Sequence, residues 1–435
     1  MKYILNKDQQ KALDAFIQFL LNPNQHEMVL TSGPGCGKSF LTGYIKQNAM
    51  ELYKKACVEQ GKLPEYFGIV LSATTNKACT VLSAATREEV NTIHNIINLR
   101  VTPNLVTGEV KLKPTSNWRI LEDIILIIDE CSMINAELYD YIHKATNHCK
   151  ILYVGDKNQL TPVKSGLSPV FTNNLPTVEL KEVVRFAGSP ELIKLADQLR
   201  ETVETGIFKP IQIVPGIIDL YHEAEMENAL DYHFKNTKVD ARIVTYTNNR
   251  SVFYNNYIRK ELRGLPDDFQ YGERVINCNN AQAITHGNKV NIVHVEDEIQ
   301  ILSIEPEVEI DRGKHTFKVI PIRFINENLG IEQKGLIPGS RDEIKQLLKV
   351  TAKEKDWRIH YFLKENLLDL RPRDSCTIHK VQGSTMDTVY IDATDLSTCT
   401  QKEVAARLLY VAVTRAKKHV VFYGDLAQKF GGFIV

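Results

Sequence analysis

The chain has 435 residues, of which 43% are hydrophobic and 24% charged, an ordinary composition for a globular protein of about three domains. Its 53 basic and 53 acidic residues cancel, which argues against a basic nucleic-acid coat protein but not against a locally basic groove. Eight cysteines show no C-x-x-C spacing, so we expect reduced thiols, no zinc or redox motif and an intracellular, cytoplasmic protein. Charged residues near the start argue against a signal peptide. The lack of an apolar run of roughly 20 residues argues against a membrane-spanning segment.

Two parts of the chain alternate short β-branched runs with segments of helical periodicity. The first part covers residues 28–154 and the second covers residues 242–423. Because such alternation is typical of strands covered by helices, it predicts an α/β fold with two parallel-sheet units.

The most informative stretch of the first part is residues 31–39, TSGPGCGKS, which follow an apolar run and precede a helical pattern from Lys38. This strand–loop–helix context is what a phosphate-binding loop requires. Backbone N–H groups would surround the phosphates of ATP, Lys38 would neutralise the β and γ phosphates, and Ser39 would ligate Mg²⁺. Ser32 stands where a glycine is usual, which a residue at negative φ tolerates. The predicted nucleotide-binding residues of this loop are Gly33, Pro34, Gly35, Cys36, Gly37, Lys38 and Ser39.

Polar side chains follow two later expected strands of the first part, at residues 124–128 and 151–154. The first of these strands leads directly into Asp129 and Glu130. At the carboxyl edge of a parallel sheet both carboxylates would lie beside the nucleotide, where Asp129 could hold Mg²⁺ and Glu130 could take a proton from attacking water. After the second strand, Gln159 could touch the γ-phosphate or serve as a turn residue.

Three stretches interrupt the α/β pattern. Residues 101–118 predict a hairpin that turns near Thr107 and Gly108. Residues 289–325 alternate apolar and polar side chains, which predicts a small antiparallel sheet or barrel. The charged residues 341–365 have helical spacing and predict a solvated helical arm, with a partner-docking helix as the less favoured alternative.

Together with the loop and the acid pair, several motifs resemble those of superfamily-one DNA helicases of the RecD/Dda-like branch, and the size is most like that of the compact Dda-like members. The motifs at residues 5–12, 180–185 and 408–416 carry this resemblance around the nucleotide. It implies that Gln9 recognises adenine and that Arg185 and Arg415 reach the γ-phosphate. The catalytic residues expected on this basis are Lys38, Asp129, Glu130, Gln159, Arg185 and Arg415, with Ser39 and Asp129 as metal ligands.

Four further motifs resemble those that face nucleic acid in this family, at residues 71–78, 91–94, 244–249 and 377–385. Two of these four motifs depart from the family pattern, because Thr74 replaces a common proline and Thr385 a common glutamate. A motor of this kind would hold its strand through phosphates. The residues that the resemblance implies for nucleic-acid binding are Thr74, Asn76, Thr92, His94, Asn248, Thr377, His379 and Lys380.

The resemblance also implies a division into domains. Two RecA-like P-loop NTPase core domains are expected, one at residues 1–186 and one at residues 187–286 together with 370–435. A hairpin insertion at about 99–120 would be the family's wedge, and residues 287–369 would form an inserted small β-barrel of SH3-like type with a helical arm. Trp118 either stacks on a base at the wedge or, as the favoured alternative, anchors the hairpin in the core.

The expected function is that of an ATP- and Mg²⁺-dependent DNA helicase, a nucleic-acid-stimulated ATP hydrolase. The family implies 5′ to 3′ translocation on single-stranded DNA, action at single/double-strand junctions as a monomer, roles in DNA replication, recombination or repair with proteins of these processes as partners, and a bacterial or phage-infected cell. Two alternatives stay open. One is an RNA helicase, because no motif reads a ribose 2′-OH decisively. The other is a nucleotide-gated nucleic-acid clamp without motor activity.

Overall fold

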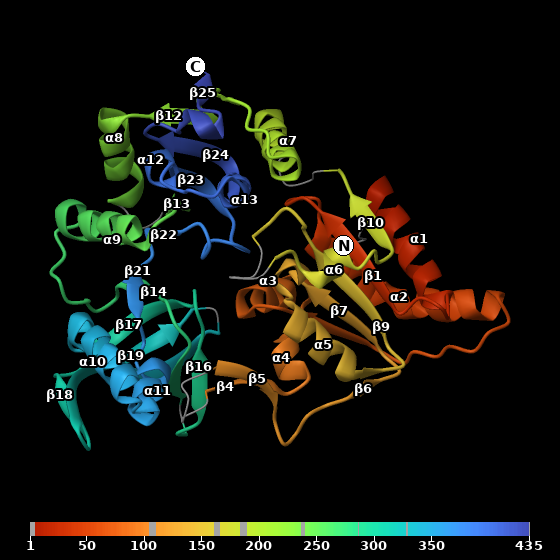
Figure 1. The fold of residues 1–435 in the computed structure, drawn as a ribbon, viewed down its shortest axis with the longest axis horizontal. Helices are drawn as coiled ribbons and strands as arrows, with labels where there is room; N and C mark the ends of the chain where they lie inside the picture. Colours follow the sequence, from red (N-terminus) through yellow and green to blue (C-terminus); the bar gives the residue numbers. More distant parts are fainter. Residues whose placement is uncertain are drawn as a thin grey trace.

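A computed structural model of the chain describes residues 5–103, 110–160, 166–182, 189–235, 240–285, 287–327 and 329–434. Figure 1 shows three large sheets in separate positions: one in the N-terminal part, a second in the green and blue part, and a third, teal, formed by the residues between the two halves of the second. None of the described helices is long and apolar enough to cross a membrane. All eight cysteines are free thiols, as the sequence predicts.

The first sheet has the strand order β10-β1-β9-β7-β2-β3, and its neighbouring strands are parallel. All residues of β7 and β9 are buried, which explains their nearly continuous apolar sequence. The strands are β1 (Glu27–Ser32), β2 (Ile69–Ala73), β3 (Asn91–Thr92), β7 (Ile125–Asp129), β9 (Lys150–Gly155) and β10 (Thr177–Leu180). The helices are α1 (Lys7–Leu21), α2 (Lys38–Glu59), α3 (Asn76–Thr86), α4 (Ile93–Ile96), η1 (Cys131–Met133), α5 (Ala136–Lys144) and α6 (Pro169–Thr172).

The expected hairpin is present as the antiparallel pair β4 (Leu99–Pro103) and β5 (Val110–Pro114). Its expected turn at Thr107 and Gly108 lies outside the described residues. Trp118 follows the hairpin, packs against the core beneath the first sheet and places its ring 5.9 Å from that of Tyr141. These contacts favour the anchoring role of Trp118. A short parallel pair, β6 (Leu121–Glu122) and β8 (Thr146–Asn147), lies nearby in the chain.

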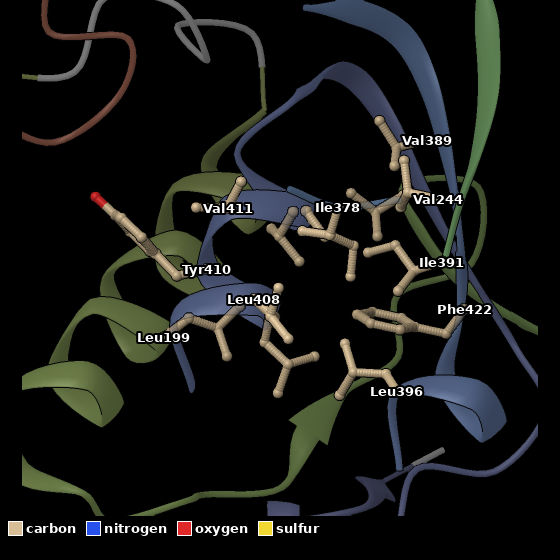
Figure 2. Packing of buried hydrophobic residues seen from close by; sticks show 14 of the residues in the cluster. Leu199, Val244, Ile378, Val389, Ile391, Leu396, Leu408, Tyr410, Val411 and Phe422 are labelled. Atoms are coloured by element: carbon tan, nitrogen blue, oxygen red, sulfur yellow. The ribbon is translucent and has the colours of Figure 1, made fainter. Parts of the chain in front are cut away.

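The second sheet has the order β12-β24-β23-β13-β22 and is also parallel. Its largest core cluster includes α13, whose apolar side chains meet those of the strands in Figure 2. The strands are β12 (Ile218–Tyr221), β13 (Ala241–Thr245), β22 (Ser375–Thr377), β23 (Met386–Asp392) and β24 (Ala416–Tyr423), and a separate parallel pair is β11 (Ile211–Gln212) with β25 (Phe433–Ile434). The helices are α7 (Pro190–Thr205), α8 (Glu223–Phe234), α9 (Asn248–Tyr257), η2 (Ile258–Leu262), α12 (Ala393–Leu396), α13 (Lys402–Val413) and η3 (Gln428–Phe430).

The third sheet is antiparallel, in the order β16-β15-β20-β19-β17-β14-β21 with β18 paired to β19. It extends beyond the expected insertion at residues 287–369, because β14 pairs with β21 where the chain enters and leaves this part. The expected helical arm is present as α10 and α11, which pack on Phe317 and Val319. The strands and helices are β14 (Arg274–Asn277), β15 (Ala281–Thr285), β16 (Val290–Val293), β17 (Glu298–Ile304), β18 (Val308–Arg312), β19 (His315–Asn326), β20 (Ile331–Pro338), β21 (Leu370–Pro372), α10 (Arg341–Glu354) and α11 (Trp357–Asn366).

Candidate active site

The glycine-rich loop joins the carboxyl end of β1 to the first turn of α2. Gly35 and Gly37 have φ values of +83° and +82°, a region in which a Cβ is strained. Gly37 directly precedes α2, so the unpaired N–H groups of the first helical turn face the loop. A helix N-terminus behind a left-handed glycine loop is an anion-binding arrangement.

Ser32 is buried and is not among the residues with positive φ, so its Cβ is accommodated as the sequence suggests. Its hydroxyl also has a role, because it accepts a hydrogen bond from the Lys38 ammonium at 3.1 Å. The same Nζ donates to the carbonyl oxygens of Ser32 at 2.9 Å and Gly33 at 3.1 Å. These three hydrogen bonds hold the Lys38 ammonium against the first residues of the loop.

The acid pair lies at the carboxyl end of β7. Asp129 is buried and its Oδ1 accepts the N–H of Glu130 at 2.8 Å. Burial, followed by the charge of Glu130, raises the pKa of Asp129 to about 7. Glu130 has a φ of +53°, and its buried Oε2 accepts no hydrogen bond from any residue that the structure describes. A buried carboxylate oxygen without a donor is suited to take a proton.

Arg415 and Gln159 approach this acid pair from the two core domains. Arg415 is 3% exposed, and its Nε and Nη1 donate to Val411 O at 3.0 Å and Ser384 O at 3.3 Å. Burial lowers the pKa of Arg415, while the charge of Glu130 opposes that shift. Gln159 is 3% exposed and follows β9 in the first core domain.

One cavity of about 290 Å³ collects these residues. Of the expected catalytic residues, Arg185 lies outside the described residues, and all the others line the cavity. Gly33 and Cys36 of the loop are not in its lining. The lining consists of Pro34, Gly35, Gly37, Lys38, Ser39, Phe40, Ala78, Val81, Asp129, Glu130, Gln159, Gly383 and Arg415.

Gln9 lies against the loop rather than in the cavity lining. Its Nε2 is 2.5 Å from the position that a Cβ on Gly37 would take, while its Oε1 accepts the N–H of Asn6 at 3.1 Å. Asn6 Oδ1 accepts the N–H of Gln9 at 2.8 Å, so the pair forms a capping box on α1. Gln9 thus fixes the start of α1 beside the loop, and its role toward adenine stays a prediction.

The expected metal ligands fit Mg²⁺. Ser39 and Asp129 line the same cavity as the phosphate-binding loop. Within the described ranges no group of three or more His, Cys, Asp or Glu side chains is placed to hold a metal. This small donor set suits Mg²⁺, which keeps several waters and is held mainly by one or two protein oxygens and substrate phosphates.

A second cavity of about 380 Å³ shares Glu130 and Gly383 with the first. Three of the residues expected to bind nucleic acid, Asn76, His379 and Lys380, line it. Its walls come from the first core domain, the second core domain and the inserted part, because Met133, Gln382 and Val295 also contribute. The structure therefore brings these three candidates together next to the first cavity.

The other nucleic-acid candidates lie at the carboxyl edges of the two parallel sheets. Thr92 pairs with Ala73 in β2 and caps α4 by accepting the N–H of Asn95 at 3.3 Å. Thr377 pairs with Thr245 in β13 and is buried. None of the remaining candidates lines the second cavity. Thr74 donates to Glu130 O at 3.0 Å, His94 lies on α4 and is half-buried, and Asn248 is exposed at the start of α9.

Comparison with known proteins agrees with this arrangement. Residues 19–165 match the model of an AAA domain, and residues 375–423 match that of a UvrD-like helicase C-terminal domain. The ATP-dependent DNA helicase Dda of Enterobacteria phage T4 is 24% identical, over 96% of this chain and 99% of its own length. The RecD subunit of the RecBCD enzyme from Buchnera aphidicola subsp. Schizaphis graminum is 24% identical, over 90% of this chain and 69% of its own.

The fold is that of solved Pif1 structures. The Bacteroides Pif1 helicase in complex with ADP-AlF3 and single-stranded DNA has a TM-score of 0.51 at 15% identity, and the match covers 100% of this chain and 95% of that one. These findings support a superfamily-one helicase of the Dda, RecD and Pif1 type. The two parallel sheets of this helicase belong to RecA-like P-loop domains, as expected from the sequence.

Sequence reasoning missed the side chains by which the parts of this helicase contact each other. Arg242 of β13 is 3.3 Å from Glu296 and 3.8 Å from Glu298 of the inserted part. Asn76 of α3 contacts His294 of the inserted part through Nδ2 and Nδ1 at 2.9 Å. The first of these contacts, Arg242 with Glu296, joins residues 54 positions apart, and the contact of Asn76 with His294 joins residues 218 positions apart. Their residue types carry no local signal, so only a family alignment could have indicated them.

Proposed function

We propose that the protein is an ATP-dependent DNA helicase that translocates 5′ to 3′ on single-stranded DNA and opens duplex DNA. We assign the first cavity to the nucleotide and call it the nucleotide cavity. The observation that carries the proposal is that residues of both core domains line this cavity. Lys38 and Glu130 come from the first core domain, whereas Arg415 comes from the second. Because both domains contribute to one site, binding and loss of the γ-phosphate would alter how the domains hold together.

The residues of the cavity divide the chemistry of hydrolysis among them. The Lys38 ammonium exchanges the loop carbonyls for the β and γ phosphates of ATP. The free Oε2 of Glu130 accepts a proton from the attacking water. Arg415 stabilises the negative charge that develops on the γ-phosphate. Mg²⁺, held by Ser39 and Asp129, would neutralise charge on the phosphates.

The strand is proposed to run past the second cavity. Lys380 and His379 of the second core domain and Asn76 of the first line it, so a strand there would touch both domains. Since Glu130 also lines this cavity, the strand and the nucleotide would share a wall. A relative named as a DNA helicase and a neighbour solved with single-stranded DNA support DNA as the strand.

The polarity and the biological setting rest on the family resemblance. We propose 5′ to 3′ movement, action as a monomer at single/double-strand junctions, and an intracellular role in DNA replication, recombination or repair beside proteins of those processes.

The test is ATP-dependent unwinding of a DNA duplex that carries a single-stranded tail at its 5′ or its 3′ end. We expect opening of the 5′-tailed duplex alone and no opening by Lys38→Ala. Opening of only the 3′-tailed duplex would overturn the polarity but keep the motor. If neither duplex opens and a matched RNA duplex does, the substrate is RNA. Tight ATP binding without hydrolysis on any strand would instead establish a clamp.

A further inference from the structure

A buried hydrogen bond joins the two core domains beside the phosphate-binding loop. The Tyr410 hydroxyl of α13 donates to Asp156 Oδ2 at 2.8 Å, and both residues are 1% exposed. Figure 2 shows Tyr410 at the margin of the core cluster, with its hydroxyl directed away from the other labelled side chains. Burial and the Asp156 carboxylate hold the pKa of Tyr410 well above its ordinary value. The phenol therefore keeps its proton and serves as a charge-assisted donor.

Asp156 is also the residue that shapes the turn carrying Gln159. Its Oδ1 accepts the N–H of Asn158 at 2.9 Å, and its carbonyl accepts the N–H of Gln159 at 3.3 Å. One carboxylate thus binds the turn of the first domain with one oxygen and the second domain with the other. A shift of Tyr410 would be passed to this turn through Asp156.

Arg407, three residues before Tyr410 on α13, also binds the turn that carries Gln159. Its Nη1 donates to the carbonyl oxygens of Lys157 at 2.8 Å and Gln159 at 2.7 Å. Residues three apart on a helix share a face, so Arg407 and Tyr410 act on the turn together. The backbone of Gln159 is therefore held by a side chain of the other core domain.

The Gln159 side chain is held from that domain as well. Gln382 Nε2 donates to Gln159 Oε1 at 3.1 Å. Gln382 lies two residues after Lys380, and both line the cavity proposed for the strand. Gln159 lines the nucleotide cavity. The position of its side chain therefore depends on Gln382, a residue of the cavity proposed for the strand.

We propose that Tyr410 and Arg407 are positioning residues through which the second core domain sets the place of Gln159 at the nucleotide and makes ATP turnover respond to the bound strand. We call Tyr410, Arg407 and Asp156 the clasp. This inference rests on the proposed function and adds to it the residues that transmit strand binding to the nucleotide. The clasp acts through Gln159 and does not touch the nucleotide cavity itself.

The test compares steady-state ATP hydrolysis with and without saturating oligothymidine in Tyr410→Phe and Arg407→Gln. Tyr410→Phe removes one hydroxyl and keeps the ring in its core. The matched control is Tyr390→Phe, because Tyr390 is equally buried and its hydroxyl contacts His233 inside the second core domain. We expect the stimulation ratio to fall at least about fivefold in both clasp variants, the lower end of coupling between sites, and to stay at the wild-type value in the control.

A double-mutant cycle identifies the bond itself. Adding Tyr410→Phe to Asp156→Ala should leave the stimulation ratio of Asp156→Ala unchanged, because the partner is already gone. Wild-type ratios in both Tyr410→Phe and Arg407→Gln, or fully additive losses in the cycle, would overturn the clasp. If a strand fails to stimulate the wild-type protein, the proposed function fails as well, so the two failures are distinguishable.

Discussion

The Lys38 ammonium is held by three oxygen atoms of its own loop, two carbonyls and the Ser32 hydroxyl. It therefore stands at the place where phosphate oxygens would enter, without a long movement of the side chain. The serine that departs from the usual signature adds an acceptor for this ammonium. At this position the unusual residue supports the site instead of weakening it.

Replacing Lys38 by Ala should reduce ATP hydrolysis by at least about a hundredfold, since a preorganised charge is lost where the transition state needs it. Steady-state turnover at saturating ATP measures this effect. Lys55→Ala is the control, because Lys55 is an exposed lysine on the same helix α2. Substantial turnover in Lys38→Ala would show that another group binds the phosphates.

The isosteric change Glu130→Gln should lower turnover by about 10² to 10⁴ while nucleotide binding stays close to wild type. The reason is that the amide fills the same space but cannot take the proton that Oε2 would accept. Fluorescent-nucleotide titration and turnover, measured together, separate the two effects. Glu137→Gln, an exposed acid on α5, is the control. A collapse of affinity with normal turnover at saturation would make Glu130 a binding residue.

At the scale of elements, Lys150 joins the start of β9 to the connection between α1 and β1. Its side chain is fully buried, its Nζ donates to Asn22 O at 2.6 Å and to Gln25 O, and it lies 4.9 Å from the centre of the Phe19 ring. Burial lowers the pKa of Lys150 to about 8. A buried amine thus ties β9 to the connection that leads into β1, its neighbour in the first sheet.

The pKa of Lys150 predicts a pH dependence of stability. The folded pKa of about 8 lies below the ordinary value of 10.5, so between these values the unfolded chain binds more protons. The free energy of unfolding should therefore rise with pH across this window, by up to about 1.4 kcal/mol per pH unit from this group. Urea unfolding at pH 8 and pH 10 should show this rise in wild type and not in Lys150→Met, after subtraction of the common background.

The control for this experiment is Lys62→Met, because Lys62 is an exposed lysine that donates to Leu21 O in the same region. Its slope with pH should equal that of wild type. An equal slope in Lys150→Met would mean that Lys150 stays charged across the whole window.

At the scale of the whole molecule, the nucleotide cavity and the clasp are both shared between two parallel sheets. The loop follows β1 and the acid pair lies at the end of β7, and both strands belong to the first sheet. Arg415 follows α13 of the second core domain. Neither domain alone has the complete site. Nucleotide binding and nucleotide turnover should therefore depend on different parts of the molecule.

The variant Arg415→Gln should keep most nucleotide binding, which the loop of the first domain provides, and lose turnover by about 10³, the lower range for an arginine finger. Turnover and nucleotide affinity are measured as for Glu130→Gln, with a melting temperature to confirm folding. Lys418→Gln is the control, because Lys418 forms a surface ion pair with Asp387 and such pairs contribute little. Normal turnover in Arg415→Gln would remove the second domain from catalysis.

The sequence was sufficient for features that are contiguous in the chain. The loop at 31–39, the acid pair after a buried strand and the alternation of strands and helices each report their structure locally, because pairing and burial impose a period or a fixed spacing. The helical arm and the antiparallel insertion followed from periodicity too. The limits of the insertion could not be predicted in this way, because β14 and β21 are short runs without a distinctive pattern. They pair although their residues are about a hundred positions apart.

The chain by itself determined which residues can bind a nucleotide and that two α/β units exist. The tertiary structure decided which side chains meet: Tyr410 with Asp156 across 254 positions, Gln382 with Gln159 across 223, and Trp118 with the core beneath the first sheet. The physical reason is that these contacts depend on how elements far apart in the chain pack against one another. Packing is set by the summed shape of many buried side chains, so no single local pattern encodes it.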